Sequence, residues 1–403
     1  MSLLVSGTAI GQLITVLSLP VLTRIYGPES FAILAVYVSA LSLLTVIAGM
    51  CFEYAIPLPQ SDRIAAALCS ISVISVLLFT ILSSVFVWVL PEAINSLTDH
   101  KIHDYLWLLP IGIFCIGIYN SLQYWSTRKR KIKLIAKTRV TQSIIGTTIK
   151  LGCGFLMNGW TAGLILGQLI SQGSGFLSLG HSLYKNDWTI FKNLKFKHLR
   201  LAAKRYAKFP KLVTLESFSN TAGIQVPIIL IAYYAAGPEV GYLMIAIQLL
   251  SIPMSLIGRS VSQVYLAEGS DRYHKGELEK FTKRTMLNLA KISAPPLLLL
   301  AIFSPFATPI ILGNEWVKTG ILITWMTPWF FMQFITSPVS TSLYITNNQL
   351  AALLLQIGGL VLRVGFVFIA VIYNKSLIPE FYAVSGFVFY LLYFFIVLKL
   401  LKN

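Results

Sequence analysis

The sequence predicts an all-α integral membrane protein, with about 12 transmembrane helices in two six-helix lobes related by a parallel repeat. Hydrophobic residues make up 56% of the 403 residues and charged residues only 12%, about half the charged share of a soluble domain. Apolar runs of about 18 residues or more recur along the chain, and each is long enough to cross a bilayer core as a helix. A transmembrane β-barrel is excluded because it would need shorter segments of alternating hydrophobicity.

Twelve apolar runs are candidate spans, and the segments between them are short. In chain order the spans are 3–26, 29–55, 64–90, 105–125, 138–157, 160–184, 212–236, 239–265, 285–312, 320–344, 349–373 and 381–401. Their connecting segments alternate in charge. Segments after even-numbered spans, with the C-terminal tail, hold 24 Lys and Arg residues, seven of them in 128–139, whereas segments after odd-numbered spans hold three. The positive-inside rule therefore places both termini in the cytoplasm, which requires an even number of spans.

The longest polar break, residues 185–211, divides the chain into an N-terminal lobe at 1–184 and a C-terminal lobe at 212–403. It carries nine Lys and Arg residues against a single acid, Asp187, and its aromatic and aliphatic residues are mixed with the cations as in an amphipathic segment. Such a segment lies in a membrane interface, with its rings among acyl tails and its ammonium groups among anionic lipid phosphates. We therefore predict a basic, amphipathic, cytoplasmic connector that contacts anionic membrane lipids.

An internal repeat relates the two lobes. The triplet Gly-Pro-Glu follows the first span at 27–29 and the seventh span at 237–239, an offset of 210 residues. Each triplet comes after a span that contains a proline, Pro20 or Pro227. A shift of six spans keeps the orientation, so the lobes form a parallel repeat. Secondary transporters of that plan bind substrate between their halves and move one half against the other.

Charged residues within the predicted spans point to an anionic substrate. A charge at the bilayer centre costs about 2.5–3.5 kcal/mol on insertion scales, so such residues are expected to line a wet cavity or to pair. The predicted spans contain five cations and only two acids in comparable positions. Because two acids cannot neutralise five cations, the excess of positive charge predicts an anionic substrate. For residues near span ends, snorkelling to the interface is the competing interpretation. The predicted substrate-binding cations are Arg24, Lys150, Arg259, Lys291 and Arg363, and the acids predicted as candidates for ion coupling are Glu53 and Glu216.

Small and polar residues share helix faces with these cations. Ser143 and Thr147 precede Lys150 at helical spacing, Ser255 and Ser262 flank Arg259, and Gln356 and Gly359 precede Arg363. Glutamines within spans predict either hydrogen bonds to sugar hydroxyls or interhelical bonds worth about 0.6 kcal/mol each; they include Gln12, Gln123, Gln142, Gln168 and Gln172. The small-residue pair Gly163 and Gly167 favours close helix packing over a ligand site.

Enzyme motifs are missing from the sequence. It contains no phosphate-binding G-x-x-x-x-G-K-[ST] loop and no conspicuous pair of nucleophile and base. Its four cysteines lie in or at apolar spans without paired spacing, which argues against a disulfide framework or a zinc site. We therefore expect no enzymatic activity, no cofactor and no metal. Nucleic acid is not an expected partner, because the basic residues flank apolar spans.

The stretch 19–32 resembles the start of the bacterial Wzx-type polysaccharide flippases of the multidrug/oligosaccharidyl-lipid/polysaccharide exporter superfamily. The residues that match that opening pattern are Pro20, Arg24, Gly27, Pro28, Glu29 and Phe31. The twelve-span plan and the basic connector agree over the full length. The resemblance implies a MATE-like fold in the bacterial inner membrane. It also implies transport of an undecaprenyl-pyrophosphate-linked oligosaccharide, the O-antigen repeat unit of lipopolysaccharide biosynthesis. The polysaccharide polymerase and the chain-length regulator would be partners.

Three other functions remain as alternatives. A cation-coupled exporter of cationic drugs with the same fold would need a surplus of acids within the membrane, and here cations exceed acids. A major-facilitator transporter would carry a basic loop after its second span, whereas residues 57–63 read Pro-Leu-Pro-Gln-Ser-Asp-Arg. A polymerase or ligase of the same glycan would need a large outward loop, which the sequence lacks.

Overall fold

The computed structural model describes residues 2–89, 102–235, 237–346 and 348–401 and divides into two compact units. The N-terminal unit contains residues 1–26 and 33–225, and the C-terminal unit contains residues 27–32 and 226–403. The described residues contain no β-strand, and every predicted span coincides with helical structure, which confirms the all-α prediction. By length and composition, seven of the described helices are apolar enough to cross a membrane.

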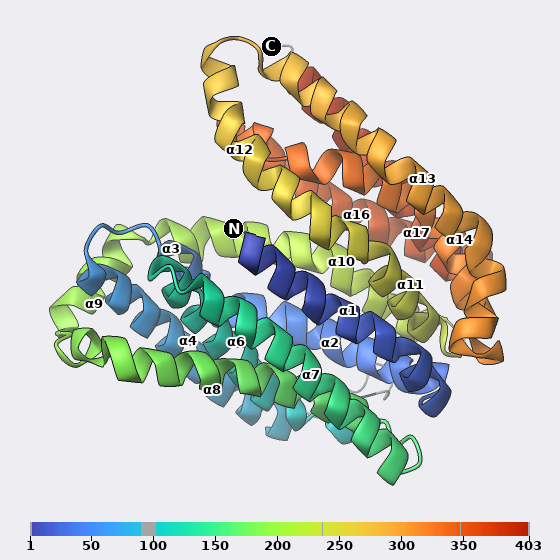
Figure 1. Ribbon diagram of the computed structural model, residues 1–403, viewed down its shortest axis with the longest axis horizontal. Coiled ribbons are helices and arrows are strands. Elements are labelled where there is room, and N and C mark those ends of the chain that lie inside the picture. Colours follow the sequence, from blue (N-terminus) through green and yellow to red (C-terminus); the bar gives the residue numbers. More distant parts are fainter. Residues whose placement is uncertain (1, 90–101, 236, 347, 402–403) are drawn as a thin grey trace. The chain divides into compact units, whose positions relative to one another are not determined.

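The N-terminal unit is a bundle of long helices in which α7 lies between α1 and α8, while α6 packs on α4 and α8 (Figure 1). The last helix, α10, is shared, because the boundary between the two units falls between Gln225 and Val226. The elements in order are α1 (Ser2–Ile25), α2 (Pro28–Ala48), α3 (Phe52–Ala55), α4 (Asp62–Val89), η1 (His103–Tyr105), α6 (Leu108–Arg128), α7 (Ile132–Leu156), α8 (Ala162–Lys192), α9 (Phe196–Arg205), the π-helical turn η2 (Phe209–Val213) and α10 (Thr214–Tyr234).

Two helix boundaries differ from the predicted spans in ways that affect the site. The second span was predicted to reach residue 55, but α2 ends at Ala48 because Met50 and Cys51 adopt left-handed conformations, with φ of 50° and 53°. Helix α7 begins at Ile132, six residues before the predicted start of its span at 138. Arg139, which was counted with the loop cations of 128–139, therefore lies two turns inside the helix and not at its start.

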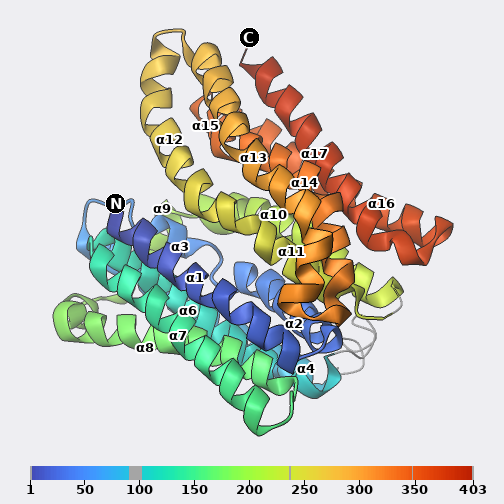
Figure 2. The same cartoon turned by 45° about the vertical axis from the view of Figure 1, so that its right-hand side comes forward.

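The C-terminal unit is built around α14, which packs against α11, α13 and α17, and α16 packs on α17 (Figure 2). Aromatic and aliphatic side chains of α13, α14 and α17 form much of its core. The elements in order are α11 (Glu239–Pro253), the π-helical turn η3 (Met254–Gly258), α12 (Arg259–His274), α13 (Leu278–Leu312), η4 (Asn314–Trp316), α14 (Val317–Thr336), η5 (Ser337–Val339), α15 (Ser342–Ile345), α16 (Gln349–Tyr373), η6 (Lys375–Leu377) and α17 (Ile378–Leu400).

The predicted connector, 185–211, contains the last turns of α8 and the short helix α9. Helix α9 packs on α4, and its Ala202 is fully buried there. Asp187 is also buried and accepts hydrogen bonds from Trp125 Nε1 at 3.2 Å and Lys131 Nζ at 2.8 Å. On the other side of α9, Phe196 is 80% exposed beside a surface rich in lysine and arginine. Contact of this face with anionic lipids stays a prediction.

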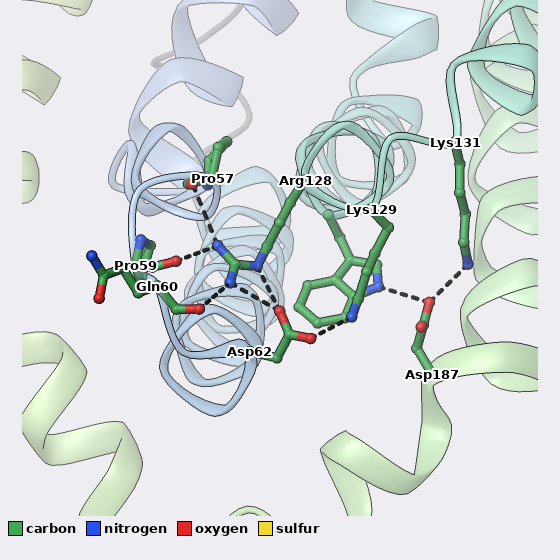
Figure 3. A network of polar contacts seen from close by, with 9 residues as sticks. Pro57, Pro59, Gln60, Asp62, Arg128, Lys129, Lys131 and Asp187 are labelled. Atoms are coloured by element: carbon green, nitrogen blue, oxygen red, sulfur yellow. Dashed lines mark hydrogen bonds and ion pairs between the residues drawn. The ribbon is translucent and has the colours of Figure 1, made fainter.

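Three segments that the charge pattern assigns to the cytoplasm meet at one end of the N-terminal unit (Figure 3). The Arg128 guanidinium donates to the backbone carbonyls of Pro57, Pro59 and Gln60 and to the carboxylate of Asp62, at 2.9 Å from Nη2. Lys129 Nζ donates to the other Asp62 oxygen at 2.6 Å. A planar guanidinium has five N–H donors in a fixed arrangement, so this one side chain can bond several backbone carbonyl groups of the proline-rich loop at once.

Replacing Arg128 by lysine is expected to lower the stability of the purified protein by about 2 kcal/mol, because a lysine retains the charge but loses the fork. Thermal unfolding in detergent measures this effect. The matched control is Arg130→Lys, which alters an exposed arginine in the same turn. Equal melting temperatures for the two variants would contradict the role given to Arg128.

Candidate functional site: a polar cavity in the N-terminal unit

The N-terminal unit contains a cavity of about 390 Å³ between α1, α6, α7 and α8. Most of its lining residues have polar side chains, and two of them are cationic. No acidic residue lines it. The lining residues are Thr8, Gly11, Gln12, Thr15, Ser18, Leu22, Tyr119, Gln123, Arg139, Gln142, Ser143, Gly146, Thr147, Lys150, Gln168, Ser171 and Gln172.

Helical periodicity brings these side chains together. On α7, Arg139, Ser143, Thr147 and Lys150 follow one another at spacings of four, four and three residues, which places them on one face. Similar spacings line up Thr8, Gln12 and Thr15 on α1, and Gln168 and Gln172 on α8. The polar stripe predicted ahead of Lys150 therefore forms one wall of the cavity.

Glycines let the cavity helices approach closely. A side chain at Gly146 of α7 would meet the Ser171 side chain of α8 at 2.9 Å, and one at Gly167 would meet the Gly146 carbonyl oxygen at the same distance. Gly163 lies against the Tyr26 hydroxyl and Cys153. Gly163 and Gly167 therefore allow the helices to pack closely, as predicted. The cavity lies where longer polar side chains keep the helices apart.

Both cations of the cavity are held by neutral groups. Arg139 Nη1 donates to Thr8 Oγ1 at 3.0 Å, and Lys150 Nζ donates to Gln168 Oε1 at 3.1 Å. Neither residue takes part in an ion pair within the described ranges. They are eleven residues apart, which is about 16 Å along a helix. The cavity therefore has a positive charge near each end and hydrogen-bonding amides between them.

The remaining predicted cations lie elsewhere or are not described. Arg24, in the last turn of α1, and Lys291, on α13, are both exposed and do not line the cavity, which fits the snorkelling alternative. The side chain of Arg259 lies outside the described part of the chain. Among the predicted cations with described side chains, Lys150 alone lines the cavity. For the others, a role in substrate binding stays a prediction.

Arg363 occupies an aromatic enclosure within the C-terminal unit. Only 4% of it is exposed, and its guanidinium lies 5.0 Å from the ring centres of Trp329 and Phe389 and 5.9 Å from that of Tyr390. Such cation–π contacts contribute about 2 kcal/mol each when desolvated. In this structure, therefore, Arg363 joins α14, α16 and α17.

The two predicted ion-coupling acids belong to the N-terminal unit. Glu53 of α3 is buried and accepts a hydrogen bond from Ser72 Oγ at 3.3 Å, and Ser72 is in turn bonded to Ser121 at 2.8 Å. Glu216 is half-buried in the first turn of α10. Neither acid lines the cavity, and their part in ion coupling stays a prediction.

Sequence reasoning missed Arg139 as a site residue. It is the second residue of the predicted span 138–157, but it was counted with the loop cations of 128–139 and not with the cations within spans. The signal that could have identified it is its register, since it extends the stripe of Ser143, Thr147 and Lys150 by one turn.

A family model described as "Polysaccharide biosynthesis protein" matches residues 21–320 of the chain. No curated protein sequence matches it. Among solved structures, an inward-facing multidrug resistance MATE family transporter of the MOP superfamily is 15% identical, with a TM-score of 0.71 over 97% of this chain and 96% of that one. The lipid II flippase MurJ, in an inward closed conformation, is 17% identical, with a TM-score of 0.73 over 98% of this chain and 87% of that one.

A third structural match is a MOP superfamily transporter from Pyrococcus furiosus, for which a binding pocket of reverse polarity is described. It is 15% identical, with a TM-score of 0.63 over 100% of this chain and 96% of that one. At these identities the likeness shows the fold alone. The chain has the all-α fold of the MATE-like membrane transporters, as predicted.

Proposed function

The chain belongs to the polysaccharide biosynthesis protein family, and we propose that it is a flippase for an undecaprenyl-pyrophosphate-linked oligosaccharide, the O-antigen repeat unit. It carries this lipid across the bacterial inner membrane by alternating access through a cationic lumen. Both termini and the basic connector face the cytoplasm in this proposal, where the lipid-linked unit is assembled. The polysaccharide polymerase and the chain-length regulator receive the unit on the far side.

The charge of the cavity carries this proposal. Arg139 and Lys150 enter it without an acidic counterpart among the lining residues. A pyrophosphate loses its hydration on entering such a site, and that loss is severe unless charge and hydrogen bonds replace it. Arginine offers paired donors to phosphate oxygens, and lysine offers a compact positive charge. A cationic drug would meet only repulsion from these two residues, so the drug-exporter alternative is disfavoured.

The uncharged lining suits the rest of the head group. Glutamine amides both donate and accept hydrogen bonds, and serine and threonine hydroxyls do the same. Five such glutamines and three threonines line the cavity beside the two cations. Sugar hydroxyls can exchange their water for these groups, whereas the polyprenyl tail stays in the lipid. The cavity therefore combines the two chemistries that a glycan on a pyrophosphate presents.

The membrane potential supplies a direction for transport. An inside-negative potential favours outward movement of an anion by about 2.3 kcal/mol per charge per 100 mV. Exchange of a proton or a sodium ion would add to this force, and Glu53 and Glu216 are the acids proposed to carry it. Glu53 suits the role because it is buried and its hydrogen bond comes from a neutral hydroxyl.

Deleting the gene tests the proposed function. The lipid-linked repeat unit is expected to be assembled normally but to remain on the cytoplasmic leaflet, because its head group cannot cross lipid unaided. Leaflet-selective labelling of the lipid-linked sugar measures this distribution, and complementation with the intact gene is the control. Labelling of the outer leaflet at the normal level in the deletion strain would overturn the proposal.

A further inference from the structure

The C-terminal unit contains a groove of about 390 Å³ between α16 and α17. All nine of its lining residues are apolar or glycine. Leu354 and Leu392 are exposed, so the groove opens at the surface of the unit. Its volume lies in the range of small-ligand sites, about 300–1,000 Å³. Six lining residues belong to α16, between Ala351 and Leu362, and three belong to α17, namely Phe389, Leu392 and Ile396.

The groove is the counterpart of the polar cavity within the internal repeat. The cavity residues of α7 lie at 139, 142, 143, 146, 147 and 150, and the groove residues of α16 lie at 351, 354, 355, 358, 359 and 362. Each groove position follows its cavity position by 212 residues, two more than the offset of the Gly-Pro-Glu triplets. The next helices agree, because Gln168 and Ser171 of α8 are matched 221 residues later by Phe389 and Leu392 of α17. The same helix pair of each lobe therefore forms a space with the same residue positions.

Corresponding positions carry opposite chemistry in the two lobes. Arg139 corresponds to Ala351, and Lys150 corresponds to Leu362. Phosphates and sugars would lose their hydration in the groove without gaining hydrogen bonds, so its walls disfavour the head group of the substrate. A hydrocarbon chain loses no hydrogen bond there and gains van der Waals contacts. The groove therefore suits the part of a lipid-linked substrate that the cavity does not.

A cation lies on the groove side of α17. Lys399 follows Leu392 by seven residues and Ile396 by three, so the three residues share a helix face. Lys399 is exposed in the last turn of α17, at the end that the charge pattern assigns to the cytoplasm. The eleven residues from Ala351 to Leu362 extend about 16 Å along a helix, roughly half of the 30 Å hydrocarbon core. The charge and the length match a lipid of the cytoplasmic leaflet with an anionic head group.

We propose that the groove between α16 and α17 binds the polyprenyl chain of the phosphorylated lipid carrier, with the phosphate beside Lys399. It is a docking site for the carrier as it arrives in the cytoplasmic leaflet, and the part of the chain beyond the groove stays in the lipid. The repeat favours the carrier over an ordinary phospholipid, because the corresponding helix pair of the other lobe lines the substrate cavity. This inference rests on the proposed function, which identifies that cavity as the site of the head group.

Photolabelling of the purified full-length protein in nanodiscs tests the proposal, with a polyprenyl phosphate that carries a diazirine on its prenyl chain. Mass spectrometry of the digested protein locates the label, which is expected on α16 and α17 at the groove. Gly358→Leu is expected to reduce this labelling about tenfold, because overpacking an occupied site is unfavourable. Lys399→Gln is expected to reduce it about threefold, as for an exposed ion pair.

The control is Gly365→Leu, the same substitution on the same helix outside the groove, and its labelling is expected to equal that of the wild type. An added Cβ would meet no atom within 4 Å at Gly358 or at Gly365, so both variants are expected to fold and to elute as wild type in size-exclusion chromatography. Should Gly358→Leu fail to fold, Lys399→Gln and competition with unlabelled lipids decide the outcome. Unlabelled polyprenyl phosphate is expected to displace the probe, and the same excess of phosphatidylglycerol is not.

Unchanged labelling of the groove in Gly358→Leu would overturn the proposal. Equal displacement of the probe by phosphatidylglycerol would do the same, because the groove would then be a general phospholipid site. The probe carries no glycan, so the result is separate from the gene deletion. A labelled groove with normal outer-leaflet labelling in the deletion strain would contradict the flippase proposal alone. An unlabelled groove with a stranded lipid-linked unit would contradict this inference alone.

Discussion

Replacing Arg139 or Lys150 by glutamine is expected to reduce export of the lipid-linked unit about ten- to a hundredfold in each case. A hydrogen bond to a charged group contributes about 1.5–3 kcal/mol, and each 1.4 kcal/mol corresponds to about a factor of ten. Glutamine keeps an amide that can hydrogen-bond within the cavity but removes the charge that the pyrophosphate requires. Surface polysaccharide in a complemented deletion strain, at native expression, measures the effect.

Lys137→Gln is the matched control, because Lys137 lies on the same helix and is exposed outside the cavity. Its export is expected to equal that of the wild type. Membrane abundance of all three variants is measured in parallel, so that lost export is not confused with lost protein. Wild-type export by both Arg139→Gln and Lys150→Gln would count against the cavity as the site of the head group.

Gln168→Glu is expected to reduce export by a similar factor, although it alters no cation. Gln168 Oε1 already accepts a hydrogen bond from Lys150 Nζ at 3.1 Å. A carboxylate of the same shape would convert this bond into an ion pair, which neutralises Lys150 and repels an incoming phosphate. The measurement is the same export assay, with Gln168→Asn as a variant that leaves the charge of the cavity unchanged.

The double variant Lys150→Gln with Gln168→Glu is expected to export less than either single variant. Each substitution lowers the charge of the cavity by one, and without the lysine the new carboxylate has no cation beside it and repels the phosphate directly. Normal export by Gln168→Glu, or a double variant that exports as well as Lys150→Gln alone, would show that the charge of Lys150 is not what the substrate uses.

The apolar runs were enough to predict the helices, because a run long enough to cross a bilayer has few other stable conformations. The ends of the helices were less predictable. Helix α7 extends six residues ahead of its apolar run, through Lys133 and Lys137 to Ile132, because charged residues with good helix propensity continue a helix beyond the membrane. Arg139, at the edge of the predicted span, was counted with the cations of this extension and was therefore missed.

Side-chain surroundings explain the other differences between expectation and structure. A cation within a span must avoid lipid, and the sequence alone cannot distinguish a wet cavity from an aromatic enclosure. Lys150 lines the cavity, whereas Arg363 is enclosed by aromatic rings. These rings, from Trp329, Phe389 and Tyr390, belong to two helices that are far apart in the chain. The polar stripe ahead of Lys150 was readable because it lies on one helix.

Transport by the purified protein in proteoliposomes tests the central claim most directly. The substrate is a fluorescent oligosaccharide on a polyprenyl pyrophosphate, and the comparison is the same glycan on a neutral polyprenol. The cationic cavity predicts that the wild type moves the pyrophosphate-linked glycan much faster than the neutral one, and that the variant lacking both Arg139 and Lys150 loses this preference. Equal rates for the two lipids in the wild type, or an undiminished preference in the double variant, would contradict the account.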